Sequence, residues 1–361
     1  MADPKPGRGF SRRKLLAGGV VATPTLALLH ETIPHQGLHE VLGGAQHPEA
    51  AAAPHGATHG GEGTAHAMFA AGRQVDHRAN GFHPSEVLRD FDYGKTTRLA
   101  SGRVLREWEL VASDKEIEVA PGVKYPAWTY NGRVPGPTLR CREGELMRVR
   151  FANGSKHPHT IHFHGIHPAL MDGMPGIGES RRGGLIGSGE SFTYEFEAEP
   201  FGLHHYHCHT SPLASHITRG LYGAFIVDPK QGRPDADELV MVMNGFDTNF
   251  DRSNEVYAVN TVGFAYVADP VRVKRGELVR IFLVNILEFD LLNSFHVHAN
   301  FFHYYPTGTS LEPTEFTDTV VQGQGQRGIL ELRFPHPGQF MFHAHVSEFA
   351  ELGWLGFFEV M

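Results

Sequence analysis

Residues 202–209 have the sequence Gly-Leu-His-His-Tyr-His-Cys-His, and residues 338–345 have the sequence Gly-Gln-Phe-Met-Phe-His-Ala-His. Both stretches begin with glycine and end in a His-x-His pair. Side chains two residues apart on an extended strand point to the same face, and the residue between them points to the opposite face. Each pair can therefore offer two imidazoles to one metal ion, while the central residue, Cys208 or Ala344, faces into the protein.

A second pair of related stretches supports an internal repeat. Residues 143–149 (EGELMRV) match residues 275–281 (RGELVRI), and a His-x-His pair follows each of them. The His-x-His pairs of the two halves are His162/His164, His207/His209, His296/His298 and His343/His345. So many imidazoles exceed the needs of one metal ion and suit a cluster of two or three transition-metal ions. We predict two copies of one domain, at residues 99–232 and 233–361.

Short strands separated by turns are predicted throughout both halves. Turn pairs such as Pro121-Gly122, Asn153-Gly154 and Pro337-Gly338 interrupt apolar runs, and no long amphipathic helix is evident. Such punctuation is typical of an all-β sandwich or barrel. The predicted strands are 119–123, 138–141, 146–151, 191–196, 224–227, 239–243, 278–284, 328–334 and 356–360.

The composition is that of a soluble globular protein, and it narrows the range of partners. The chain has 361 residues, of which 41% are hydrophobic and 20% are charged, which is enough for two hydrophobic cores. The formal net charge of −8 argues against binding to nucleic acid. The two cysteines, Cys141 and Cys208, cannot build a disulfide framework, and we expect Cys141 to be a small buried apolar residue.

The N-terminus has the pattern of an export signal. Residues 11–16 (SRRKLL) form a twin-arginine motif, and the weakly apolar stretch that follows is too short to span a bilayer. We predict a twin-arginine signal over residues 1–30 and a periplasmic or extracellular location; the alternative is a merely basic N-terminus. Residues 31–98 are rich in His, Gly and Ala, and we expect a disordered linker, with weak copper capture as the alternative role.

The two copies differ at three positions that carry chemistry. These are Cys208, His159 and His216 in the first copy, and Ala344, Asn293 and approximately Leu352 in the second. Two imidazoles and a thiolate are the ligand set of a blue-copper electron-transfer site. On extended strands, His159 and Cys208 lie on the face opposite to that of the neighbouring His-x-His pairs. Their side chains can therefore converge inside the domain. Taken singly, His159 and His216 also fit ordinary core or surface histidines, but their joint restriction to the copy with Cys208 favours a metal site.

These motifs resemble those of the multicopper oxidases, specifically the two-domain, laccase-like members with the blue copper in the first domain, which are related to the copper nitrite reductases. Residues 131–138 (NGRVPGPT), the spacing from His159 to His164, and residues 207–209 carry the resemblance. It implies two tandem cupredoxin-like Greek-key β-barrel domains and four copper ions per subunit. The implied ligands are His159, Cys208 and His216 for a type 1 copper, His162 and His296 for a type 2 copper, and His164, His207, His209, His298, His343 and His345 for a type 3 pair.

The resemblance also implies a reaction. A phenol, an aromatic amine or a metal ion would be oxidised by one electron at the type 1 copper, and dioxygen would be reduced by four electrons to water at a trinuclear cluster. Leu221 stands where the axial ligand of the family falls, and because leucine cannot coordinate, it would raise the reduction potential. Candidate proton donors are Asp172, Glu348 and Glu351, with ordinary surface or capping carboxylates as the alternative.

The assembly and the exact activity leave alternatives open. With two domains in the chain, the resemblance implies a cyclic homotrimer in which domain 1 of each subunit faces domain 2 of the next. A copper nitrite reductase shares the two-domain body, but that family has an aspartate at the position of His162 and a non-coordinating residue at the position of His209. A non-catalytic copper carrier, with the histidine-rich stretch from His30 to His83 as its working part, is the third reading.

Overall fold

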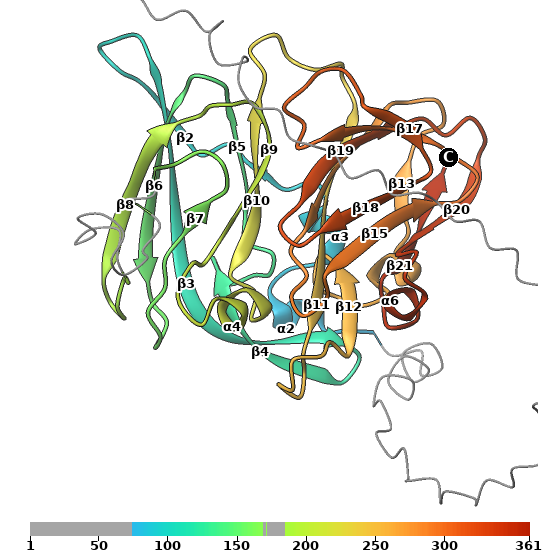
Figure 1. Ribbon diagram of the computed structural model, residues 1–361, viewed down its shortest axis with the longest axis horizontal. Coiled ribbons are helices and arrows are strands. Elements are labelled where there is room, and N and C mark those ends of the chain that lie inside the picture. Colours follow the sequence, from blue (N-terminus) through green and yellow to red (C-terminus); the bar gives the residue numbers. More distant parts are fainter. Residues whose placement is uncertain (1–73, 169–170, 172–184) are drawn as a thin grey trace, which may run out of the picture. The chain divides into compact units, whose positions relative to one another are not determined.

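The computed structural model describes residues 74–168, 171 and 185–361. The strands form four β-sheets, and the helices are short (Figure 1). The helices are α2 (His77–Asn80), α3 (Pro84–Val87), α4 (Leu213–Thr218), α5 (Ala265–Ala268) and α6 (Ser347–Glu351). None of the described helices is long and apolar enough to cross a membrane.

The first half of the described chain contains two sheets. One has the strand order β1-β5-β10-β9-β7, and the other has the order β2-β3-β6-β8, with β4 also paired to β3. The strands are β1 (Phe91–Asp92), β2 (Lys95–Arg98), β3 (Val104–Ala120), β4 (Val123–Tyr130), β5 (Thr138–Arg142), β6 (Leu146–Asn153), β7 (His162–Phe163), β8 (Ser191–Glu197), β9 (Gly202–His207) and β10 (Tyr222–Asp228).

The second half contains the other two sheets. Their strand orders are β12-β11-β14-β19-β16-β17 and β13-β21-β20-β15-β18. The strands are β11 (Asp237–Phe246), β12 (Val256–Val259), β13 (Val271–Val273), β14 (Val279–Asn285), β15 (Leu292–Val297), β16 (Phe302–Pro306), β17 (Glu315–Thr317), β18 (Thr319–Gly323), β19 (Arg327–Leu332), β20 (Gly338–His343) and β21 (Leu355–Val360).

Strand pairing repeats between the two halves. In the first half β10 pairs parallel with β5 and antiparallel with β9, which in turn pairs antiparallel with β7. In the second half β21 pairs parallel with β13 and antiparallel with β20, which pairs antiparallel with β15. A short helix follows the His-x-His pair after β9 and after β20. The repeated pattern confirms the prediction of an all-β protein made of two tandem copies.

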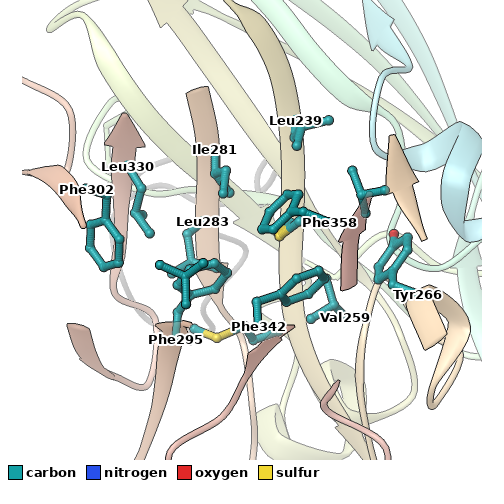
Figure 2. Packing of buried hydrophobic residues seen from close by; sticks show 14 of the residues in the cluster. Leu239, Val259, Tyr266, Ile281, Leu283, Phe295, Phe302, Leu330, Phe342 and Phe358 are labelled. Atoms are coloured by element: carbon teal, nitrogen blue, oxygen red, sulfur yellow. The ribbon is translucent and has the colours of Figure 1, made fainter. Parts of the chain in front are cut away.

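The second half has its own hydrophobic core. Ile281 and Leu283 of β14 meet Phe295, Phe342 and Phe358 of the facing sheet, and all five side chains are buried (Figure 2). The rings of Phe342 and Phe358 lie 4.8 Å apart, which is within the favourable range for aromatic pairs. Alternate residues of β14 thus fill the space between the two sheets, as a period of two requires.

The other face of β14 packs against the first half. Phe282 and Val284 of β14 and Val242 of β11 share a buried cluster with Ala224 and Ile226 of β10. A strand that is buried on both faces is expected to be an uninterrupted apolar run, and β14 (VRIFLVN) is buried at every position. The two halves are therefore joined by an apolar interface rather than by the linker alone.

Buried charges join the halves next to this interface. Arg140 of β5 donates hydrogen bonds to Asp228 of β10, with Nε 2.8 Å from Oδ2, and to Glu238 of β11, with Nη2 3.2 Å from Oε1. Arg280 of β14 donates to the same Glu238 over 2.8 Å and to Glu331 over 2.6 Å. Both arginine side chains are almost fully buried. Glu238 therefore bridges two guanidinium groups, one from each half.

Two expectations from the sequence are wrong in detail. Residues 77–98 were expected to belong to a disordered linker, but they contain α2, α3, β1 and β2. Phe82, Val87 and Leu88 are buried there, and three apolar residues are too few to give a periodic signal. The predicted strand 119–123 is the end of β3, a turn and the start of β4. The predicted signal at residues 1–30 lies outside the described residues.

The shared carboxylate yields a stability prediction. Glu238→Gln keeps the shape of the side chain but removes the charge between Arg140 and Arg280. We expect a loss of about 3 kcal/mol in the free energy of unfolding at neutral pH, measured by urea denaturation. Glu116→Gln is the control, because the ion pair of Glu116 with Lys124 is exposed, and its loss should leave the free energy of unfolding almost unchanged. Equal losses in the two variants would contradict the role given to Glu238.

The same group predicts a pH dependence. Burial alone would raise the pKa of Glu238, but the hydrogen bonds and charges of Arg140 and Arg280 lower it below the usual value. A carboxyl group with a lowered pKa in the folded state stabilises the protein above its unfolded pKa of about 4.3, and that stabilisation is lost as the pH falls through the folded pKa. Urea midpoints should therefore drop more steeply in acid for the wild type than for Glu238→Gln.

Candidate metal centres

Two imidazoles and one thiol converge inside the first half. His159 precedes β7, Cys208 follows the last residue of β9, and His216 lies in α4. The Nδ1 atoms of His159 and His216 are 3.2 Å apart, and the Sγ atom of Cys208 is 3.9 Å and 3.3 Å from them. All three residues are buried. The structure thus brings together the set that the comparison of the two copies predicted.

The backbone around Cys208 is held on both sides. The Cys208 N–H group donates to the carbonyl oxygen of Leu221 over 2.9 Å, and the Thr160 N–H group lies 3.4 Å from the cysteine Sγ. Burial raises the pKa of the Cys208 thiol, while contacts with Thr210 and Thr160 lower it by a smaller amount. A buried thiol of this kind needs a bound cation to become a thiolate, and soft sulfur favours copper among the common metals.

The two imidazoles of this set are neutral. Burial lowers the pKa of His159 to about 3, with a further contribution from the neighbouring His216. Burial likewise lowers the pKa of His216 to about 4. Neutral imidazole is the form that binds metal. With a buried sulfur and two inward nitrogen atoms, the donor set fits a type 1 copper.

Four further histidines gather at the ends of β7 and β9. His162 and His207 are direct partners across the two strands. The Nε2 atoms of His164 and His207 lie 2.8 Å apart, and the ring centres of His162 and His209 lie 5.0 Å apart. Burial, together with His207 and His162, lowers the pKa of His164 to about 2. We call His162, His164, His207 and His209 the first half-set.

The second half repeats this arrangement at the ends of β15 and β20. His296 and His343 are direct partners across the strands, and the Nε2 atoms of His298 and His343 lie 3.0 Å apart. The ring centres of His296 and His345 are separated by 5.4 Å. We call His296, His298, His343 and His345 the second half-set. Unlike the first, it includes two exposed members, His298 and His345.

The two half-sets share details that the sequence alone did not reveal. The His209 N–H group donates to the Thr160 hydroxyl over 3.0 Å, and the His345 N–H group donates to the Ser294 hydroxyl over 2.8 Å. Each hydroxyl residue stands two positions before the first histidine of the preceding pair. A hydroxyl residue at this position is visible in the sequence, but its contact with the second pair is evident only from the fold.

A carboxylate also reaches the second half-set through a hydroxyl group. The Nδ1 atom of His296 lies 2.8 Å from the Thr319 hydroxyl, which donates to the Asp318 carboxylate over 3.0 Å. The contact arises because β15 pairs with β18, which sequence spacing does not reveal. Of the predicted proton donors, Glu348 and Glu351 are exposed on α6, and Asp172 lies outside the described residues.

The half-sets are separate groups within one chain. Ligand atoms of His162, His164 and His207 lie within 4.8 Å of one another, and those of another three histidines, His296, His298 and His343, do so as well. Over the ranges that the structure describes, no such group combines histidines from the two halves.

Comparisons with known proteins agree with this architecture. Residues 112–232 and 233–361 each match a family model described as multicopper oxidase. A solved structure of a multicopper oxidase is 62% identical, with a TM-score of 0.77. The match covers 80% of this chain and 100% of that one. The copper nitrite reductase structure from Nitrosomonas europaea is 28% identical, with a TM-score of 0.64, and the match covers 71% of this chain and 94% of that one.

A curated relative points in the same direction. The copper-containing nitrite reductase of Neisseria gonorrhoeae is 31% identical over an alignment of 253 residues. The alignment covers 64% of this chain. The match spans 62% of the length of that protein. The strand pairing that repeats between the two halves and the similarity to these proteins together define a protein of two cupredoxin-like domains. The chain belongs to the multicopper oxidase family.

The sulfur site yields a prediction with an internal control. Cys208→Ser should lower the copper content by one ion per chain and abolish the visible absorption of a copper–thiolate bond, because the hydroxyl is a poor ligand for copper. Cys141→Ser is the control, since the Cys141 sulfur lies 3.7 Å from the Met147 sulfur and belongs to none of the groups of candidate metal ligands in the described residues. Atomic absorption and visible spectra provide the two readouts. Loss of copper in both variants would contradict the assignment.

Proposed function

We propose that the protein is a copper-dependent oxidoreductase that oxidises a phenol, an aromatic amine or a metal ion and uses dioxygen as the acceptor. The observation that carries the proposal is the presence of two matched half-sets beside one His₂Cys set. Once bound, the copper ions would take single electrons from the reductant and deliver four of them to dioxygen, which leaves as water. The family to which the chain belongs supports this reading.

We assign the ligands by matched position. His159, Cys208 and His216 would hold the type 1 copper. The type 2 copper would use His162 and His296, and the type 3 pair would use His164, His207, His209, His298, His343 and His345. Four copper ions per chain follow from this assignment. Leu221 is buried in the same cluster as Cys208 and would leave the type 1 copper without an axial ligand.

The chain itself links the sulfur site to the first half-set. Cys208 is joined through the main chain to His207 and His209, and the Nδ1 atom of His207 lies 2.8 Å from the Cys208 carbonyl oxygen. The contact from Asp318 through Thr319 to the Nδ1 atom of His296 would orient this imidazole toward a bound copper. Asp172, Glu348 and Glu351 remain the proposed proton donors.

The activity is tested by stoichiometry. With hydroquinone as reductant, the copper-loaded protein should consume one dioxygen molecule for every four electrons supplied, as recorded by an oxygen electrode together with the copper content. Nitrite reductase is the second candidate, because two of the similar proteins are nitrite reductases. Efficient nitrite reduction without oxygen uptake, in protein that holds two copper ions per chain, would replace the oxidase proposal.

We further propose that the protein works as a cyclic homotrimer, with the first half-set of one subunit facing the second half-set of the next. The second half-set is partly exposed, and apolar side chains around it are exposed as well: Leu291 (86%), Val321 (58%) and Phe316 (64%). Exposed apolar surface of this kind favours a protein–protein interface.

We also propose that the reducing substrate is a small molecule. The protein would be exported by the twin-arginine route.

Complementation between two inactive variants tests the shared site. His164→Ala damages the first half-set, and His345→Ala damages the second. Each variant alone should be inactive, but trimers reassembled from an equal mixture should recover about one quarter of the wild-type activity, because one interface in four then joins two intact half-sets. Light scattering before and after mixing confirms the assembly. No recovery from mixed trimers would place both half-sets of a working cluster in one chain and refute the proposal.

A further inference from the structure

The indole of Trp128 touches the three imidazoles nearest to the sulfur site. Its ring centre lies 5.1 Å from that of His159, 4.8 Å from that of His216 and 4.7 Å from that of His157. Of these, His159 is 0% exposed and His216 is 4% exposed. Trp128 is only partly buried, and His157 is exposed. In the described part of the chain, Trp128 therefore lies between the copper-binding imidazoles and the solvent.

Trp128 is fixed by the backbone and by a cation. The backbone N–H group of Trp128 donates to the backbone carbonyl oxygen of Arg219 over 2.8 Å. This bond holds β4 against the end of α4. The Arg219 guanidinium carbon lies 5.0 Å from the centre of the indole, in the range of a cation–π contact. The same guanidinium donates to the Pro126 carbonyl oxygen over 3.0 Å. The two side chains are therefore positioned as a unit.

The second half of the protein contributes an aromatic ring to this unit. The Arg219 guanidinium carbon lies 4.7 Å from the ring centre of Phe250, which is 48% exposed in the connection between β11 and β12. Phe250 has a φ of +64°, an unfavourable conformation for a residue with a side chain. Its ring centre also lies 6.0 Å from that of the buried Tyr125, so one side of the ring packs on the core and the other faces solvent. We call His157, Trp128, Arg219 and Phe250 the aromatic row.

Carboxylates beside the row already have partners. Asp114, which pairs with Trp128 across β3 and β4, accepts hydrogen bonds from Ser155 and from the Lys156 N–H group. Glu255 accepts hydrogen bonds from Thr248 and Asn249. Across residues 74–168, 171 and 185–361, no ion pair neutralises Arg219. The row thus presents flat rings and a positive charge, which suit an electron-rich aromatic molecule and disfavour a divalent cation.

We propose that the aromatic row is the docking surface for the reductant, that the reductant is a planar phenol or aromatic amine, and that Trp128 carries its electron to the sulfur site. This deepens the proposed function and rests on it for the acceptor of the electron. Each docking event removes one electron from the ring and reduces the bound copper by one electron. A phenol also releases its proton, which water accepts. The aromatic radical then leaves.

Binding is tested in copper-free protein, where no oxidation occurs. Of the three tryptophans, Trp108 and Trp354 are buried, so saturable quenching of fluorescence by 4-nitrobenzenesulfonate reports on Trp128. Arg219→Gln and Phe250→Ala should weaken the binding of this probe about tenfold. Arg272→Gln is the control, because Arg272 is exposed and paired with Glu359 on another sheet. Absence of saturable quenching, or equal affinities in all variants, would overturn the docking surface.

Electron transfer is tested separately by anaerobic stopped-flow reduction of the copper-loaded protein. Trp128→Leu should slow reduction by hydroquinone about tenfold or more, while Trp128→Phe, which keeps an aromatic ring, should recover part of the rate. Dithionite, a small reductant that needs no stacking surface, should reduce all variants equally. The visible spectrum of the oxidised protein must be unchanged, which separates this role from a structural one. Equal slowing with both reductants would refute the role of Trp128.

The two proposals fail in different ways. Anaerobic reduction of the sulfur site needs no half-set, so a protein without oxygen uptake can still bind the probe and accept an electron through Trp128. Conversely, oxygen uptake with hydroquinone that is insensitive to Trp128, Arg219 and Phe250 would leave the oxidase standing and remove the aromatic row from its mechanism.

Discussion

The alternation of side chains along an extended chain is the constraint on which both metal-binding regions depend. At the end of β9 it turns His207 and His209 to one side and buries Cys208 on the other. At the end of β20 the same geometry operates, but the buried central residue is Ala344. The same backbone arrangement thus produces two different sets of side chains in the two copies. The first copy has a sulfur site directly behind its imidazoles, and the second has imidazoles alone.

Packing between the halves keeps this arrangement rigid. Strands β11 and β14 are buried on both faces, one against their own domain and one against β10 of the first. Glu238 then ties Arg140 to Arg280 beside the same interface. Among the described residues, the two half-sets form separate groups of histidines. This separation is the physical reason for proposing that they meet across two subunits of a ring.

Local and repeated features were predictable from the sequence, whereas contacts made by distant strands were not. The repeat and the parity of Cys208 could be read directly, because they depend on neighbouring residues. The contact of Thr319 with His296 was missed because it exists only once β18 pairs with β15. Trp128 was missed for a similar reason. Its proposed role depends on its contacts with His159 and His216, and these contacts form only when β4 folds against α4. Residues 77–98 were misjudged because their few buried apolar side chains complete a surface built by other strands.

The surroundings of the sulfur site explain why its partner should be aromatic. Leu221 contributes no donor atom, and burial keeps both imidazoles away from solvent. With the ligands assigned as proposed, a reductant would not reach the bound copper directly and would transfer its electron across a side chain. A ring system between donor and acceptor shortens that gap, and Trp128 is the group in contact with both imidazoles. Since Arg219 and Phe250 extend the same surface toward the second half, the first domain supplies the sulfur site while both domains shape what can reach it.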